Sequence, residues 1–211
     1  MEKMKQFSDE KIKDMILTAS EQGDYNLLKS IMNNLTEEDR KNLLLPIARA
    51  GAFGGHYTIV HYAATGGGLD DIINDRLTIL YAVESGDLDV VDYLIGVCSV
   101  DIFKMNLFEQ LCQSSISKKH NKVLKYLLCY SIECGEVVQY KQTVEKSLIV
   151  HAIEHDNLEV VKMLCDNFNI SIEYSLLETA SKNEEIFSRL ADLYLEQRRH
   201  LTKGFNSQSM N

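Results

Sequence analysis

The sequence contains almost no residues that interrupt helices. Pro46 is the single proline among 211 residues, and tryptophan is absent. Proline lacks a backbone N–H and clashes with the preceding helical turn, so its scarcity leaves long stretches free to be helical. Apolar residues make up 45% and charged residues 25%, which is typical of a folded rather than a disordered chain. The composition therefore favours a helical fold.

The sequence also has fewer basic than acidic residues. The chain has 22 basic and 31 acidic residues, a formal net charge of −9. Proteins that bind nucleic acids or anionic membranes gain affinity from basic contacts to phosphate, so we expect neither as a partner. No run of about 18 apolar residues is present, which predicts no membrane span. Residues 1–10 are polar and lack the apolar core of a secretory signal, so we expect a cytoplasmic protein.

The five cysteines do not suggest a disulfide framework or a zinc site. Their number is odd, and no two have Cys-x-x-Cys spacing. We interpret them as reduced thiols that pack mainly within helices. They are Cys98, Cys112, Cys129, Cys134 and Cys165.

A motif of roughly 33 residues recurs along the chain. Its clearest copies are residues 79–94 and 149–164. Each has a small residue, then a turn four positions later, then a polar-Leu-acid-Val-Val-x-apolar-Leu run. Weaker copies align with these two, and a degenerate sixth copy lies at 176–190. The corresponding apolar pairs begin at residues 27, 59, 90, 123 and 160, with steps of 32, 31, 33 and 37.

Each copy predicts two short antiparallel helices. The first half has apolar residues at helical spacing, and Ala82 or Ala152 permits a neighbouring helix to approach. The turn residues Gly86-Asp87 suit a left-handed exit from the first helix and a cap for the second. One such pair cannot bury its apolar face alone, so neighbouring pairs must stack.

This pattern resembles the ankyrin repeat, whose units read as a T-P-L-H-x-A-A opening, a Gly-His turn and a V-V-x-L-L second helix. The resemblance covers roughly residues 15–190 and implies an all-α solenoid of about six helix-turn-helix repeats. Matching residues in the two clearest units are Ala82, Gly86, Val90-Val91, Leu94, Ala152, Val160-Val161 and Leu164.

The sequence departs from the family pattern at two places. Leu77-Thr78-Ile79-Leu80 stands where the family has Thr-Pro-Leu-His, and only Pro46 corresponds to the family's proline, which suits a first helical turn. The family's Gly-Ala-Asp-Val-Asn ending is absent, so we expect plain loops in place of β-hairpins. Another α-solenoid of paired helices is the alternative.

The organisation along the chain predicts one repeat domain over residues 1–200. A polar tail at 201–211 is expected to be disordered. The 37-residue step implies an insertion near residues 134–143. Six of the eleven glycines lie between Gly51 and Gly68, which predicts an irregular second unit.

One motif suggests an enzyme as the alternative function. His151-Ala152-Ile153-Glu154-His155 matches H-x-x-E-H, which on a helix puts two imidazoles on one face with a carboxylate nearby, as in a zinc-dependent hydrolase. The same residues are in register with Tyr81–Ser85 of the other clear repeat, so packing explains them without metal. We therefore expect no cofactor, no catalytic residue and no enzymatic activity.

The resemblance implies a protein–protein interaction module that binds through the concave face of the repeats. In ankyrin repeats that face is lined by residues just before each inter-helix turn and by the connecting loops, with aromatic anchors among polar residues. Carried over by register, the candidate binding residues are Glu21, Gln22, Phe53, Tyr57, Arg76, Glu84, Ser85, Ser117, Lys118, Lys146, Glu154 and His155.

The acidic balance favours a basic protein partner, and we expect the chain to act as a monomer. Its proline-poor composition and degenerate repeats resemble ankyrin-type proteins of intracellular bacteria or large viruses. That resemblance implies an effector secreted into a host cell, where it acts on a host protein.

Overall fold

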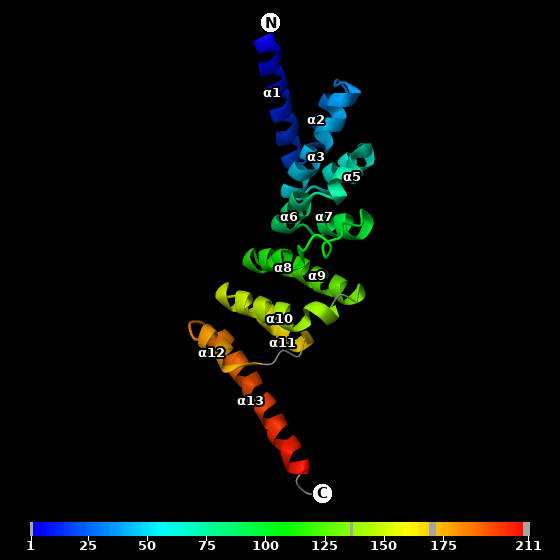
Figure 1. Ribbon diagram of the computed structural model, residues 1–211. Coiled ribbons are helices and arrows are strands. Elements are labelled where there is room, and N and C mark those ends of the chain that lie inside the picture. Colours follow the sequence, from blue (N-terminus) through cyan, green and yellow to red (C-terminus); the bar gives the residue numbers. More distant parts are fainter. Residues whose placement is uncertain (1, 136, 169–171, 209–211) are drawn as a thin grey trace. The chain divides into compact units, whose positions relative to one another are not determined.

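The fold is described by a computed structural model that covers residues 2–135, 137–168 and 172–208 (Figure 1). Side chains are described for residues 10–135, 146–166 and 172–199. Within these ranges every regular element is a helix and no strand occurs, which confirms the predicted all-α class. The plain connections expected in place of β-hairpins are found throughout the described chain. No described helix combines the length and apolar character needed to cross a membrane.

Six helix pairs follow one another in the described part of the chain, as predicted. Helices α1 and α2 form the first pair, α3 and α4 the second, α6 and α7 the third, α8 and α9 the fourth, α10 and α11 the fifth, and α12 and α13 the sixth. Their bounds are α1 Glu2–Glu21, α2 Tyr25–Met32, α3 Glu37–Phe53, α4 Tyr57–Ala63, α6 Arg76–Ser85, α7 Leu88–Asp92, α8 Phe108–Ser117, α9 Asn121–Glu133, α10 Val137–Glu154, α11 Leu158–Phe168, α12 Tyr174–Ala180 and α13 Glu184–Gln208.

The second helices of the second and third pairs are extended by π-helical turns. Helix α4 continues into the π-helix η1 (Ala64–Gly68) and then α5 (Leu69–Ile73), and α7 continues into the π-helix η2 (Tyr93–Val97). The chain divides into two compact units, Met1–Ser115 and Ile116–Asn211, here called the N-terminal and C-terminal units. The division falls within α8.

The turn inside each of the first five pairs uses a left-handed residue, as the repeat motif predicted. Positive φ angles occur at Gly23 (73°), Gly55 (71°), Gly86 (78°), Lys119 (59°) and Asp156 (49°). These positions have the same spacing as the apolar pairs. A left-handed residue reverses the chain at the helix end with a minimum of residues.

The residue after each turn caps the second helix in several repeats. The side chains of Asp24 and Asp87 accept hydrogen bonds from the amides of Leu27 and Val90, each at 3.0 Å. Asn157 does the same for Val160 at 3.3 Å. These bonds satisfy amides that have no partner within the helix.

The apolar pairs of the repeats point into the core. Ile59, Val60, Val90, Val91, Val123, Leu124, Val160 and Val161 are fully buried. The first pair is an exception, because Leu28 is buried whereas Leu27 is 42% exposed. In the N-terminal unit, α3 packs against α1, α4 and α6; in the C-terminal unit, α10 packs against α11 and α12.

The glycine-rich second repeat is ordered by close helix contacts. A Cβ at Gly51 would lie 2.6 Å from Cγ2 of Ile59, and one at Gly54 would collide with the Glu21 carbonyl oxygen. Glycine at these two positions therefore permits α3 to approach α4 and the end of α1. The predicted irregularity is confined to the η1 segment, where Gly67 has φ 105°.

Three local predictions had different outcomes. Pro46 was expected in a first helical turn, but α3 begins at Glu37 because Thr36 caps it and three acidic residues follow. Pro46 therefore lies inside the helix. The longer fifth repeat is accommodated by α10, which has 18 residues against 10 in α6. Residues 201–208 of the tail predicted to be disordered continue helix α13, and residues 209–211 lie outside the described residues.

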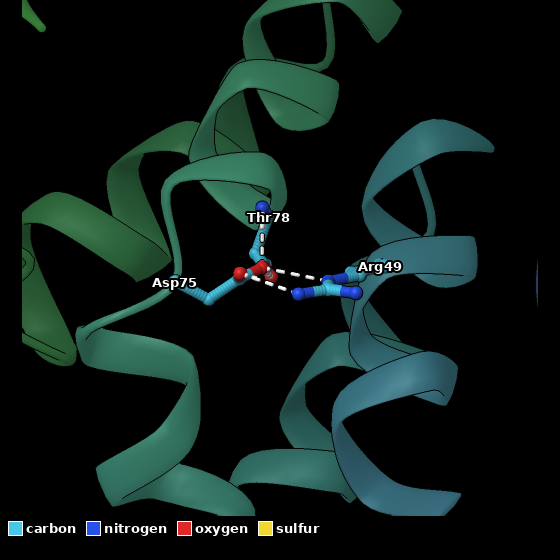
Figure 2. Close-up of polar contacts among 3 residues, drawn as sticks. All are labelled: Arg49, Asp75 and Thr78. Atoms are coloured by element: carbon cyan, nitrogen blue, oxygen red, sulfur yellow. Dashed lines mark hydrogen bonds and ion pairs between the residues drawn. The ribbon is translucent and has the colours of Figure 1, made fainter.

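A bidentate ion pair joins the second and third repeats. Arg49 on α3 donates from Nε and Nη2 to the two carboxylate oxygens of Asp75, at 2.9 and 2.7 Å (Figure 2). Asp75 also caps α6 by accepting bonds from the amide and hydroxyl of Thr78, at 2.9 and 2.6 Å. The Asp75 side chain is 11% exposed. One carboxylate thus fixes the start of α6 and the distance between two neighbouring first helices.

The Asp75→Ala variant should lose about 2–3 kcal/mol of unfolding free energy, because it removes a cap and leaves Arg49 without its partner. Asp24→Ala is the matched control. This variant removes a helix cap from α2 whose carboxylate forms no ion pair, so the unfolding free energy should fall by about 1 kcal/mol. Urea unfolding monitored by circular dichroism measures both. Equal losses in the two variants would show that the Arg49 contact adds nothing.

Stability should also depend on pH through Asp75. Burial alone raises the pKa of this carboxyl, but the bonds from Arg49 and Thr78 outweigh burial and hold the pKa below its ordinary value. The stabilisation is therefore complete above the unfolded-state pKa of about 3.9 and is lost as the pH falls through the lower folded pKa. Asp75→Asn should be less stable than the parent at pH 7, and the difference should shrink below about pH 4. A difference that stays constant down to pH 2.5 would contradict this.

Candidate interaction surface

Three neighbouring first helices of the N-terminal unit line a groove. It has a volume of about 420 Å³ and is formed by α1, α3 and α6. We call it the first-helix groove. Its lining combines apolar, aromatic and charged side chains of Lys13, Leu17, Glu21, Pro46, Arg49, Ala50, Phe53 and Tyr81.

Phe53 is the prominent apolar side chain of this groove. It is the last residue of α3 and is 51% exposed. Its ring meets that of Tyr81 edge to face, with centroids 5.7 Å apart and an interplanar angle of 83°. This contact fixes the orientation of the Phe53 ring while half of its surface faces solvent. Aromatic side chains held in this way are typical anchors of protein interfaces.

One charged side chain and one backbone carbonyl of the groove are held by the neighbouring repeat. Arg49 is fixed by Asp75, which raises the pKa of its guanidinium. At the end of α1, the Glu21 carbonyl oxygen lies 2.9 Å from Nε2 of His56. A carbonyl oxygen only accepts hydrogen bonds, so Nε2 carries the proton and donates. The edge of the groove therefore has a defined position.

The predicted binding residues of the N-terminal unit divide into two groups. Glu21 and Phe53 line the first-helix groove. Gln22 is exposed in the following turn, and Arg76, Glu84 and Ser85 are exposed or half-buried on α6. Tyr57 lies elsewhere, because it belongs to the second helix α4 and contacts His61 and Tyr93.

In the C-terminal unit, the hydroxyl of one predicted binding residue, Ser117, contacts another, His155, and also His151 of the H-x-x-E-H motif. Ser117 Oγ lies 2.7 Å from Nε2 of His151 and 3.3 Å from Nε2 of His155. The two imidazole centroids are 4.4 Å apart. Ser117 at the end of α8 thus contacts both histidines of α10. This arrangement joins two neighbouring first helices, as Arg49 and Asp75 do in the N-terminal unit.

The other predicted residues of this unit are at its surface. Lys118 is exposed in the turn after α8, and Glu154 is exposed near the end of α10. Lys146 forms an ion pair with Glu173, with Nζ and Oε1 2.5 Å apart. Both partners are about half exposed, so the pair contributes little to stability.

The geometry of the H-x-x-E-H motif does not resemble a zinc site. Both Nε2 atoms point to the Ser117 hydroxyl, whereas the Glu154 carboxylate lies 3.9 Å from Nδ1 of His151, on the other side of that ring. The carboxylate and the two Nε2 atoms therefore do not converge on one point. Among the described residues, no group of three His, Cys, Asp or Glu side chains is placed to hold a metal ion.

Several groove residues were missed by the sequence analysis, although a simple signal was available. The prediction took only the residues next to each turn. On a helix, the residue four positions earlier lies on the same face. Applying that step to Glu21, Phe53 and Ser85 gives Leu17, Arg49 and Tyr81, all of which line the groove.

The negative charge is concentrated in the N-terminal unit. Residues 1–115 contain 10 Lys and Arg against 18 Asp and Glu, whereas residues 116–211 contain 12 against 13. Nearly all of the net charge of −9 therefore belongs to the unit that contains the first-helix groove. A basic partner would be attracted to this unit first.

Dialysis against zinc followed by metal analysis tests the histidine pair. Because no third His, Cys, Asp or Glu side chain of the described residues joins the two imidazoles, the protein should retain much less than one zinc per chain. His155→Ala should retain the same amount as the parent. One zinc per chain that is lost in His155→Ala would contradict this.

Comparison with known families gives an independent assignment. The family model of ankyrin repeats, in three copies, matches residues 79–176. No curated protein sequence matches the chain. The matched region contains both of the clear repeats identified from the sequence and the weaker copy between them. Residues 79–176 are therefore ankyrin repeats.

Proposed function

We propose that the protein binds a partner protein through the first-helix groove of its N-terminal unit. Ankyrin repeats indicate a protein–protein interaction module. The single observation that carries the groove assignment is the half-exposed Phe53 ring, held against Tyr81 beside the apolar surfaces of Leu17, Pro46 and Ala50. Keeping an aromatic ring in water is unfavourable, and an apolar side chain of a partner would cover it.

The electrostatics support a basic partner. The N-terminal unit carries the excess of carboxylates, so a partner with lysine and arginine around its apolar anchor would be attracted over a distance and oriented at the groove. Encounter should slow as salt is added. We also propose that the protein acts as a monomer by binding rather than by catalysis. The composition and degenerate repeats support an effector that acts on a protein of a host cell.

The test replaces the aromatic anchor and measures peptide binding. Peptides that bind the full chain are selected from a displayed random library. The affinity of the best binder is then measured by fluorescence anisotropy. Phe53→Ala should weaken it about 30-fold, which corresponds to about 2 kcal/mol. Phe187→Ala is the matched control, because that ring is 40% exposed on α13. It should change the affinity less than twofold.

Equal affinity of the Phe53→Ala variant and the parent for the selected peptides would contradict the proposal. Circular dichroism and thermal unfolding of both variants check that the truncations leave the fold intact. Phe53 is half exposed, so its loss should cost less than about 1.5 kcal/mol of stability.

A further inference from the structure

A second hollow lies on the N-terminal unit, formed by second helices. It has a volume of about 280 Å³ and lies between α4, α7 and η2. It shares no residue with the first-helix groove. We call it the tyrosine pocket, and its lining residues are Tyr57, Asp89, Asp92, Tyr93 and Val97.

The aromatic wall of the tyrosine pocket is held in place by mutual contacts. Tyr57 stacks on His61 with centroids 5.6 Å apart and meets Tyr93 edge to face at 5.1 Å. The ring of His61 in turn packs against Tyr93, and its Nδ1 lies 3.1 Å from the Tyr93 hydroxyl oxygen. Tyr93 is 7% exposed, whereas Tyr57 is 43% exposed. The three rings therefore present Tyr57 to solvent in a fixed orientation.

Two carboxylates complete the pocket. Asp89 and Asp92 are exposed and lie three residues apart on α7, on the same side of that helix. The sequence has no lysine or arginine between Arg76 and Lys104. Within the described part of the chain, neither carboxylate forms an ion pair with a basic side chain. Asp87 differs, because its carboxylate caps the helix.

Val97 supplies an apolar edge. It is 68% exposed, at the end of the π-helix η2 that continues α7. The pocket thus combines a fixed aromatic ring, an exposed aliphatic side chain and two negative charges within one small volume.

We infer that the tyrosine pocket binds the cationic side chain of a lysine or arginine from a basic segment of a partner protein. The carboxylates neutralise the charge, the Tyr57 ring attracts a cation through its quadrupole, and Val97 covers the aliphatic stem. A bare divalent cation fits less well, because calcium takes six to eight oxygen ligands and half of this lining is carbon. Phosphate or an acidic peptide would be repelled.

The test uses the full chain labelled with nitrogen-15 and short capped peptides with one central residue. A lysine peptide and an arginine peptide should both shift the backbone amides of residues 88–97 in a saturable way, and their dissociation constants show which cation is preferred. A norleucine peptide has the same stem as lysine without the charge and should cause no saturable shift. Added salt should weaken the lysine and arginine complexes.

Two variants and one matched control locate the site. The double variant Asp89→Asn and Asp92→Asn should raise the dissociation constant at least tenfold, and Tyr57→Leu about three- to tenfold. The control Asp70→Asn and Asp71→Asn removes the same charge from α5 of the same unit and should change the constant less than twofold. Phe53→Ala should leave lysine binding unchanged, so failure of the groove and failure of the pocket are distinguishable.

Three outcomes would overturn the inference. The first is no saturable shift with either cationic peptide up to about 10 mM. The second is equal binding of the norleucine peptide. The third is a loss in the α5 control as large as in the Asp89 and Asp92 variant, because that would show attraction to the overall charge of the unit and no local site.

Discussion

Each of the first five helix pairs depends on one residue in the left-handed conformation, which reverses the chain between the two helices of the pair. Glycine takes this conformation without strain at positions 23, 55 and 86, whereas Lys119 and Asp156 adopt it in the fourth and fifth repeats. A non-glycine residue there costs about 1 kcal/mol or more. Packing of the next helix in the correct register, which the tight turn makes possible, offsets this strain. Only in that register do the apolar pairs, such as Val90-Val91, face the core.

The same constraint explains which parts of the fold the sequence predicts. Turn, cap and apolar pair are local signals that recur at one spacing, so the six helix pairs and the burial of Val160-Val161 follow from periodicity. Contacts between repeats carry no such signal. The pairing of Arg49 with Asp75 joins residues 26 positions apart and depends on how α3 lies beside α6. Pro46 lies inside α3 and not in its first turn, because Thr36 caps the helix and α3 begins at Glu37.

The candidate site was predictable in its helices but not in its extent. Register identifies the residues at the end of each first helix, and Glu21 and Phe53 line the groove for that reason. Tyr57 was grouped with Phe53 because both are aromatic and flank one turn. They belong to different helices of the pair, however, so their side chains leave the turn on different sides. Tyr57 therefore joins Tyr93, whose position in η2 depends on a π-helix that the repeat pattern does not encode.

The distribution of residue types along the first helices is consistent with the proposed binding function. The buried position keeps a small residue, as Ala82, Ser115 and Ala152 show. The two surface positions next to it, one helical turn apart, change from repeat to repeat. They are Leu17 and Glu21, Arg49 and Phe53, Leu80 and Glu84, Gln113 and Ser117, and Val150 and Glu154. A catalytic site requires particular groups to converge on one reacting atom. A frame that stays constant while its exposed positions differ in size, charge and aromatic character instead supplies a composite surface, in which the set of side chains determines which partner fits.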